Sequence, residues 1–204
     1  METFADYMLA EENYIKKIEI AYYLSKRERL FFDKSVIFKT ELARMFIDTM
    51  KLNVDRNLVI TACLLYACRK STNPSDLSKI KSYAKDGAEY LELLGFDEKF
   101  CTICEQANRY TNVEPRTSEG DILELVDQLG GMMVDREERR GFPLDEAIVL
   151  LEHRNLKNYN NIYLEKFKEF INKFCSLSPS LTVNKIRLSF LSSAVYCDWK
   201  GCYG

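Results

Sequence analysis

The sequence predicts an all-α protein, a helical bundle of about seven or eight helices, from three observations. Glycine and proline are few, 8 and 4 in 204 residues, so little of the chain is marked as turn. Apolar residues recur at intervals of three and four along most of the chain, which is the spacing of amphipathic helices. One stretch, residues 54–70, is apolar nearly all round, as expected for a helix at the centre of a bundle.

The first half of the chain divides into helices at turn and capping signals. Residues 71–74 have the composition of a turn, and Ser75 is suited to cap the helix that follows. Gly95 stands where a helix C-terminus favours a left-handed residue. The helices expected in this half cover residues 4–22, 35–51, 54–70 and 75–94.

The second half begins with Asp97, a suitable helix cap, and is broken by a polar loop around Pro115. After Pro179 the apolar pattern fits a strand and a helix equally well, so both remain open. The helices expected here cover residues 97–110, a segment that starts at Ser118 or at Asp121 and runs to 133, and residues 144–154 and 159–174. The core positions predicted for the whole bundle are Leu42, Phe46, Val59, Ala62, Cys63, Leu125, Val126, Leu129, Ala147, Leu150 and Phe167.

Composition and charge exclude several classes of partner. The formal net charge is −2, so no overall basic field attracts the chain to nucleic acid. No apolar run reaches the roughly 18 to 20 residues of a membrane span, so no membrane association is expected. The opening residues lack the basic and apolar regions of a signal peptide, and seven cysteines are an odd count. We therefore expect a cytoplasmic protein with reduced thiols.

Residues 122–170 carry the longest ordered motif in the chain. A helix with Asp127 on its inner face runs into the pair Asp135-Arg136, a basic loop follows, and Asp145-Glu146-Ala147 opens the next helix. This order resembles the HD superfamily of metal-dependent phosphohydrolases, and most closely its HD-GYP branch. In the resemblance Asp127 falls at the last metal ligand of the family.

Residues 58–70 are similar to a second HD signature, a buried helix that ends in Ala-Leu-Leu-His-Asp-x-Gly-Lys. Tyr66-Ala67 stands at the His-Asp pair, and Lys70 is what survives of the end of that signature. The upstream family histidine aligns roughly with Phe38, and the paired histidine of the HD-GYP branch falls near Gln106-Ala107. The Gly-Tyr-Pro segment is absent. The resemblance covers about residues 36–174.

The resemblance implies a cleft that has lost its chemistry. An HD site holds a divalent metal with imidazoles and carboxylates, and the metal supplies hydroxide near neutral pH. Phenylalanine and alanine cannot ligate, and a tyrosine ligates only as a costly phenolate. The sequence therefore predicts no cofactor and no metal, with Asp127 as the single ligand if a metal is retained. The predicted remnant cleft comprises Phe38, Tyr66, Ala67, Lys70, Gln106 and Asp127.

Loss of the cation would leave Asp127 without its counter-charge. The hydroxyl of Tyr66 can donate a hydrogen bond in its place, and the ring can fill the vacated space. We therefore predict direct or water-bridged contact between Tyr66 and Asp127.

Three other sets of residues are candidates for a binding or catalytic role. Arg136, Arg139 and Arg140 are candidates for phosphate contact, although Glu137 and Glu138 favour local ion pairs. His153, the single histidine, ends a predicted helix and is expected to be structural. Cys101 and Cys104 have the spacing of a redox or zinc pair but lie inside an amphipathic helix, which favours buried thiols.

The resemblance predicts an N-terminal helical extension at 1–35 packed on the core, a degenerate HD-like domain at 36–175, and a tail at 176–204. The leading functional hypothesis is a non-catalytic regulatory module, a pseudoenzyme, that binds a protein partner or a small phosphorylated ligand in the remnant cleft. One alternative is a phosphohydrolase or phosphodiesterase with a rearranged metal site. The other is a scaffold for self-association, as a homo-oligomer, through the N-terminal helix and the tail.

Overall fold

The computed structural model describes residues 3–28, 30, 32, 35–70, 77–134, 140–158 and 161–177. This part of the chain contains nine α-helices, one short 3₁₀ helix and no strand, which confirms the all-α prediction for these residues. The elements are α1 (Phe4–Ala10), α2 (Tyr14–Arg27), α3 (Ser35–Met50), α4 (Arg56–Leu65), α5 (Leu77–Leu93), α6 (Glu98–Gln106), η1 (Arg109–Thr111), α7 (Ser118–Met133), α8 (Leu144–Asn158) and α9 (Leu164–Leu177).

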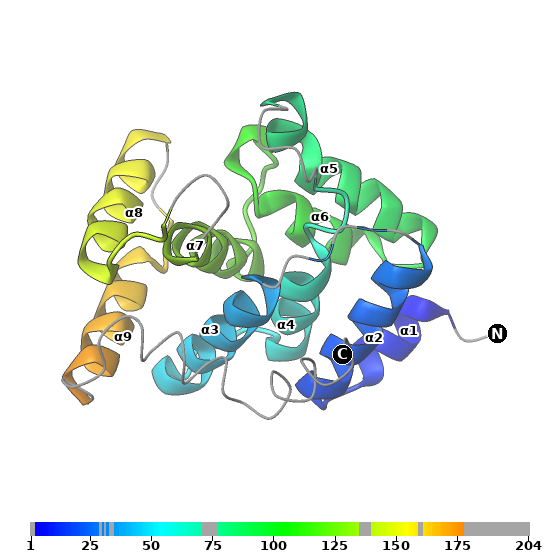
Figure 1. The fold of residues 1–204 in the computed structure, drawn as a ribbon, viewed down its shortest axis with the longest axis horizontal. Helices are drawn as coiled ribbons and strands as arrows, with labels where there is room; N and C mark the ends of the chain where they lie inside the picture. Colours follow the sequence, from blue (N-terminus) through cyan, green and yellow to red (C-terminus); the bar gives the residue numbers. More distant parts are fainter. Residues whose placement is uncertain are drawn as a thin grey trace.

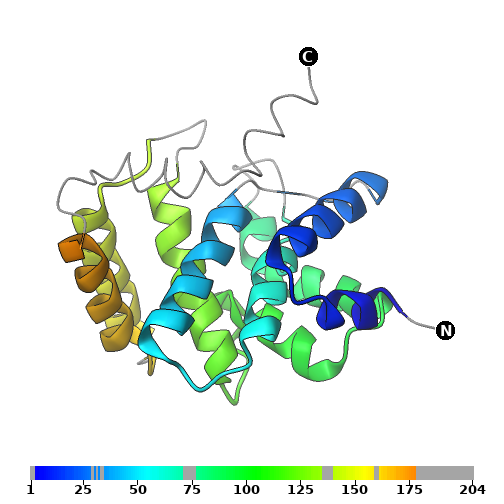
Figure 2. The ribbon, with the colours of Figure 1, turned by 90° about the horizontal axis from the view of Figure 1, so that it is seen from below.

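The helices are arranged around a central group of three. Figures 1 and 2 show α3, α4 and α7 side by side in the middle of an elongated molecule. The pair α8 and α9 lies at one end, and α1 and α2 lie at the other. Helices α5 and α6 pack against each other, and α6 also contacts α4 and α7. Helices α3 and α7 carry two residues of the candidate site described below, and a third directly follows α4.

Helix α4 occupies the centre because nearly every side chain on it is apolar. The carboxylate of Asp55 caps its first turn by accepting from the backbone N–H of Leu58, 3.0 Å away, and residues 58–65 are all buried. The helix is shorter than the predicted 54–70. Tight turns follow Leu65, in which the N–H of Lys70 bonds the carbonyl of Ala67 at 3.0 Å. These turns end the helix at the point where Tyr66 enters the site.

The predicted single helix over residues 4–22 is wrong, because the structure contains two helices there. Asn13 accepts hydrogen bonds from the backbone of Ile15 and Lys16 and so starts α2 anew. Asparagine competes for backbone groups in this way and favours caps over helix interiors. This break gives nine helices in the described residues instead of seven or eight.

The predicted core is confirmed except at one position, since Leu150 is only partly buried. Helix α9 packs Phe167 and Phe170 against Phe46 of α3, with ring centroids 4.8 and 5.4 Å apart. At the other end α1 and α2 pack on α4, and they bury Met8 and Ile18 in the same core. Residues 178–204, where strand and helix remained open, lie outside the described residues.

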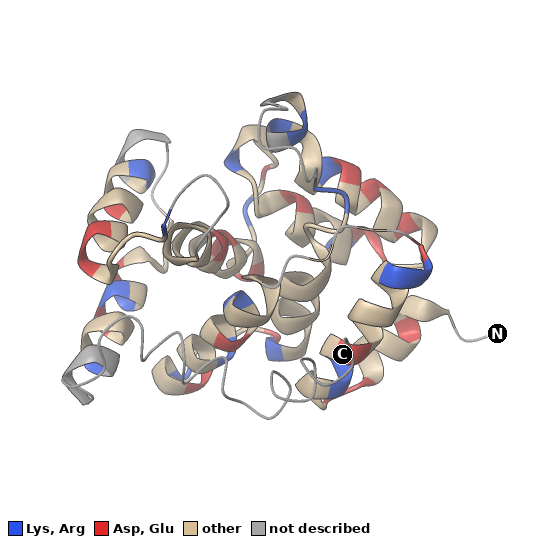
Figure 3. Ribbon diagram, in the orientation of Figure 1, with Lys and Arg blue, Asp and Glu red and all other residues tan. Residues whose placement is uncertain are grey.

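Charged side chains of both signs are interspersed over the outer helices, whereas α4 has a single charge, Arg56 at its first residue (Figure 3). Surface pairs such as Lys79 with Asp86, 3.1 Å apart, are typical of this distribution. No helix in the described ranges combines the length and the apolar character that crossing a membrane requires.

Candidate functional site

Three side chains from different parts of the fold meet around the carboxylate of Asp127, and we call the four residues the Asp127 cluster: Lys39, Tyr66, Tyr83 and Asp127. The ammonium of Lys39 donates to Asp127 Oδ1 at 2.7 Å and to the Tyr66 hydroxyl oxygen at 2.9 Å. The Tyr66 hydroxyl in turn donates to Asp127 Oδ1. The Tyr83 hydroxyl donates to the other carboxylate oxygen, Oδ2, at 3.1 Å.

The central helices bring the cluster together. Lys39 comes from α3, Tyr66 directly follows α4, Tyr83 lies on α5 and Asp127 on α7. Lys39 is three residues before Leu42 and seven before Phe46, so it shares their inner face although it is charged.

Glycines on two neighbouring helices leave room for the cluster. A Cβ atom on Gly130 of α7 would lie 2.6 Å from Cγ of Lys39, which is too close for the lysine stem to remain where it is. A Cβ atom on Gly87 of α5 would lie 2.6 Å from the carbonyl oxygen of Tyr66. The missing side chains therefore allow α7 to accept Lys39 and α5 to approach Tyr66.

The cluster holds Asp127 as an anion. Burial alone would raise the pKa of this carboxyl, but the charges of Lys39 and Lys70 and the hydrogen bonds from Lys39 and Tyr66 outweigh it, so the pKa lies below its ordinary value. For Tyr66, burial first and then the neighbouring Asp127 charge raise the pKa well above the ordinary value. Tyr66 is thus a neutral hydroxyl that donates to an ionised carboxylate.

The predicted contact between Tyr66 and Asp127 is confirmed, and other members of the predicted cleft lie nearby. Tyr66 is fully buried, and Ala67 is buried beside it. The ammonium of Lys70 lies 5.5 Å from the centre of the Tyr83 ring. Phe38 is buried and packs towards α7, where its Cδ1 atom is 3.4 Å from the position of a Cβ on Gly130.

Gln106 does not join the Asp127 cluster. Its amide nitrogen donates to the carbonyl of Pro115 at 2.8 Å, and its amide oxygen accepts from the hydroxyl of Thr117 at 2.7 Å. It lies against Gly120, seven residues before Asp127 on α7, which is about 10 Å along a helix. The alignment with a family histidine predicted a cleft residue, whereas the structure makes Gln106 a brace for the loop that leads into α7.

A second ionic cluster surrounds Glu124, and sequence reasoning missed it. The carboxylate of Glu124 pairs with Arg109 at 2.8 Å and with Arg116 at 3.1 Å, and Arg116 also pairs with Asp121 at 3.0 Å. Burial raises the pKa of Glu124, and the two arginines oppose that effect. The sequence held one signal for it. Asp121 and Glu124 lie six and three residues before Asp127, a spacing that places all three carboxylates near the same inner face of α7. Arg109 and Arg116 lie on or beside η1 and the loop before α7, so their ion pairs join η1 and this loop to α7, and the amide of Gln128 adds a further hydrogen bond to Glu124 at 2.8 Å.

The remaining candidates do not form a site. Burial raises the pKa of Cys101 to about 11 and that of Cys104 well above its ordinary value, so neither is a reactive thiolate. His153 and Arg140 are exposed, whereas Arg136 and Arg139 lie outside the described residues. In the part of the chain that the structure describes, no three His, Cys, Asp or Glu side chains converge as metal ligands would.

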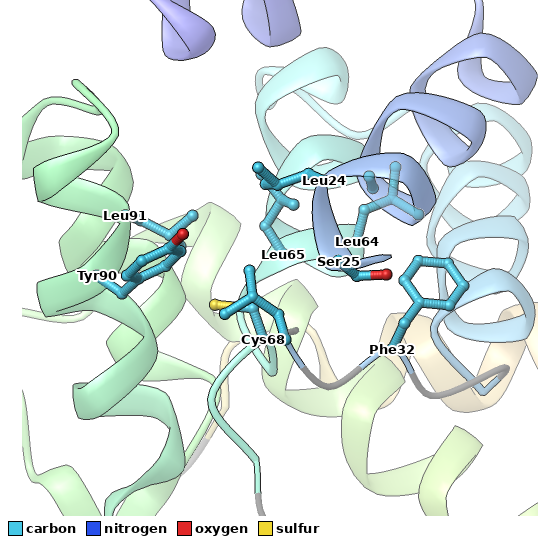
Figure 4. Close-up of a pocket in the computed structure, with 10 residues that line it drawn as sticks. Leu24, Ser25, Phe32, Leu64, Leu65, Cys68, Tyr90 and Leu91 are labelled. Carbon is cyan, nitrogen blue, oxygen red and sulfur yellow. The ribbon is translucent and has the colours of Figure 1, made fainter. Parts of the chain in front are cut away.

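A small pocket lies between α2, the end of α4 and α5 (Figure 4). None of the residues that line it belongs to the Asp127 cluster. Leu24, Leu65, Cys68 and Leu91 line it, and Tyr90 stands at one side. Most of the lining side chains are apolar, Ser25 and Tyr90 add hydroxyl groups, and burial raises the pKa of the Cys68 thiol to about 12. The Ser25 hydroxyl donates to the carbonyl of Tyr22 at 2.6 Å, and the Cys68 thiol is held protonated by burial, so neither of these two groups is an activated nucleophile.

Comparisons of the chain with protein-family models, with curated proteins and with solved structures found no match.

Proposed function

We propose that this chain is a non-catalytic HD-like domain that acts as a regulatory binding module. The observation that carries the proposal is the ammonium of Lys39, which neutralises Asp127 from 2.7 Å. The resemblance to HD phosphohydrolases gives Asp127 a metal cation as its neighbour. The Lys39 ammonium supplies the positive charge beside Asp127 that a metal supplies in the family, and this supports the proposal of a site that no longer needs a metal.

The donors around Asp127 do not fit a catalytic divalent ion. A carboxylate offers about four lone-pair positions, and three are used by Lys39, Tyr66 and Tyr83. The side chains in these positions are an ammonium and two phenols, which are hydrogen-bond donors here. An ammonium does not bind and acidify water as a divalent ion does. The contact of Tyr66 with Asp127 also supports the HD-like comparison, because the family places those two positions on either side of one metal.

The charge of the cleft favours a small phosphorylated ligand over a neutral one. Two cations, Lys39 and Lys70, influence Asp127, so the local charge is one unit positive. Lys39 is buried, whereas Lys70, in the turns that follow α4, is only partly buried and reaches solvent. We infer that Lys70 contacts the ligand phosphate, in the way that lysine ammonium groups bind phosphate as point charges.

Calorimetric titration with pyrophosphate and with a nucleoside monophosphate, in buffer with a metal chelator, tests this function. We expect binding of one of them, weakened on the order of 10-fold by Lys70→Met because a charge-assisted contact is lost. Lys79→Met is the matched control, since Lys79 is an exposed lysine paired with Asp86. Binding that Lys70→Met leaves unchanged, or release of inorganic phosphate from pyrophosphate, would contradict the proposal.

A further inference from the structure

A lysine is buried at the opposite end of the molecule from α9, beneath the first helix. Lys17 of α2 is 0% exposed, and its ammonium donates to the carbonyl of Met8 at 2.7 Å and to the hydroxyl oxygen of Thr61. The Thr61 hydroxyl donates its own proton to the carbonyl of Asn57 at 2.8 Å, so it is an acceptor for Lys17. Both acceptors of this ammonium are neutral.

Helix α1 is the cover over Lys17. It has seven residues, too few for a stable isolated helix, so its contacts with the rest of the protein hold it in place. It buries Ala5 and Met8, and the ring of Phe4 meets the edge of Phe96, with centroids 6.0 Å apart. The connection to α2 is three residues long.

The C-terminal end of α1 is fixed by donors from two other helices. The side-chain nitrogen of Lys17 on α2 donates to the carbonyl of Met8, and the side-chain amide of Asn57 on α4 donates to the carbonyl of Leu9. Both carbonyls belong to the last turn, where a helix has no partners of its own and where a positive charge is favourable. The side-chain nitrogen of Lys17 therefore bonds the end of α1, but burying it in its charged form is costly.

The carboxylates near Lys17 do not pair with it directly. Glu11, just after α1, forms an ion pair with Lys16 at 2.9 Å. Asp55, at the start of α4, caps that helix through the N–H of Leu58. Their charges stabilise the ammonium, but burial is the larger effect and lowers the pKa of Lys17 to about 8.

We propose that α1 is a latch whose release from α2 and α4 is coupled to uptake of a proton by Lys17. In the docked state Lys17 is enclosed, and in the released state its amine is in water and binds a proton more tightly. The pKa is about 8 when docked and near its ordinary 10.5 when released. The released state therefore gains protons between these values, so docking strengthens as pH rises through that window and weakens as pH falls to 8. The inference is independent of the function of the Asp127 cluster.

Hydrogen exchange of the whole chain measures how often α1 leaves its docked position, once the rates are corrected for the intrinsic effect of pH on exchange. Between pH 7 and 9.5 we expect the protection of the α1 amides to rise on the order of 10-fold. In Lys17→Met the corrected protection should not change with pH. The amides of α6 are the internal reference, because α1 should open more often than the core.

A side-chain NMR titration of Lys17 in the unmodified chain makes the test independent of how well the variant folds. The midpoint of the Lys17 titration should lie near pH 8, well below that of exposed lysines. The protection of the α1 amides should rise from that pH upwards. Titration of Lys17 together with the exposed lysines, α1 protection that stays constant with pH, or exchange of α1 only together with α6 would each overturn the latch.

Discussion

Replacing Lys39 with methionine is expected to lower the free energy of unfolding by about 3 to 5 kcal/mol, because it leaves Asp127 charged without its partner. The Lys39 side chain is 2% exposed and that of Asp127 16%, so water replaces the lost ammonium only in part. Methionine keeps most of the aliphatic volume beside Gly130, so the loss reports the charge and not the packing. Denaturant unfolding of the single variant measures the effect.

The double variant Lys39→Met with Asp127→Leu distinguishes the cost of an unpaired charge from the contribution of the ion pair itself. Removing both charges should recover much of the lost stability, since replacing a buried ion pair with apolar groups is often nearly neutral. Lys79→Met breaks an exposed pair and should cost less than about 1 kcal/mol. A Lys39→Met variant as stable as the Lys79→Met control would show that the ammonium is not needed to balance Asp127.

Tyr66 is expected to contribute to stability through its ring and its hydroxyl separately. Tyr66→Phe keeps the ring and removes the donor to Asp127, and should cost about 1 to 2 kcal/mol. Tyr66→Ala also leaves a cavity in a fully buried position, and should cost about 3 to 5 kcal/mol. Unfolding free energies of the two variants give the comparison. A Tyr66→Phe variant as stable as the wild type would mean that the hydroxyl does not replace a lost counter-charge.

The sequence was informative where one physical effect dominates. Residues 58–65 are apolar except for Thr61, so a central position was the way to bury them, and the structure agrees. The contact between Tyr66 and Asp127 was predictable because a buried carboxylate needs a donor and a phenol supplies one. Asn13 was missed because the apolar stripe continues across it, although asparagine is a strong helix cap.

The rest of the cluster was not predictable from residue type alone. Lysine is ordinarily a surface residue, so Lys39 was passed over in favour of Phe38 although its spacing to Leu42 and Phe46 places it inside. Gln106 was assigned by alignment, whereas its position depends on hydrogen bonds to a loop at Pro115 and Thr117. Such contacts are set by tertiary packing and have no periodic signal in the sequence.

Metal analysis of protein purified without added metal tests most directly whether Lys39 has replaced a catalytic cation beside Asp127. Elemental analysis of the wild type and of Asp127→Ala, with folding checked by circular dichroism, provides the comparison. The expected result is no stoichiometric iron, manganese or zinc that depends on Asp127. About one or two bound ions per chain, lost in Asp127→Ala, would contradict the non-catalytic account and favour a phosphohydrolase with a rearranged site.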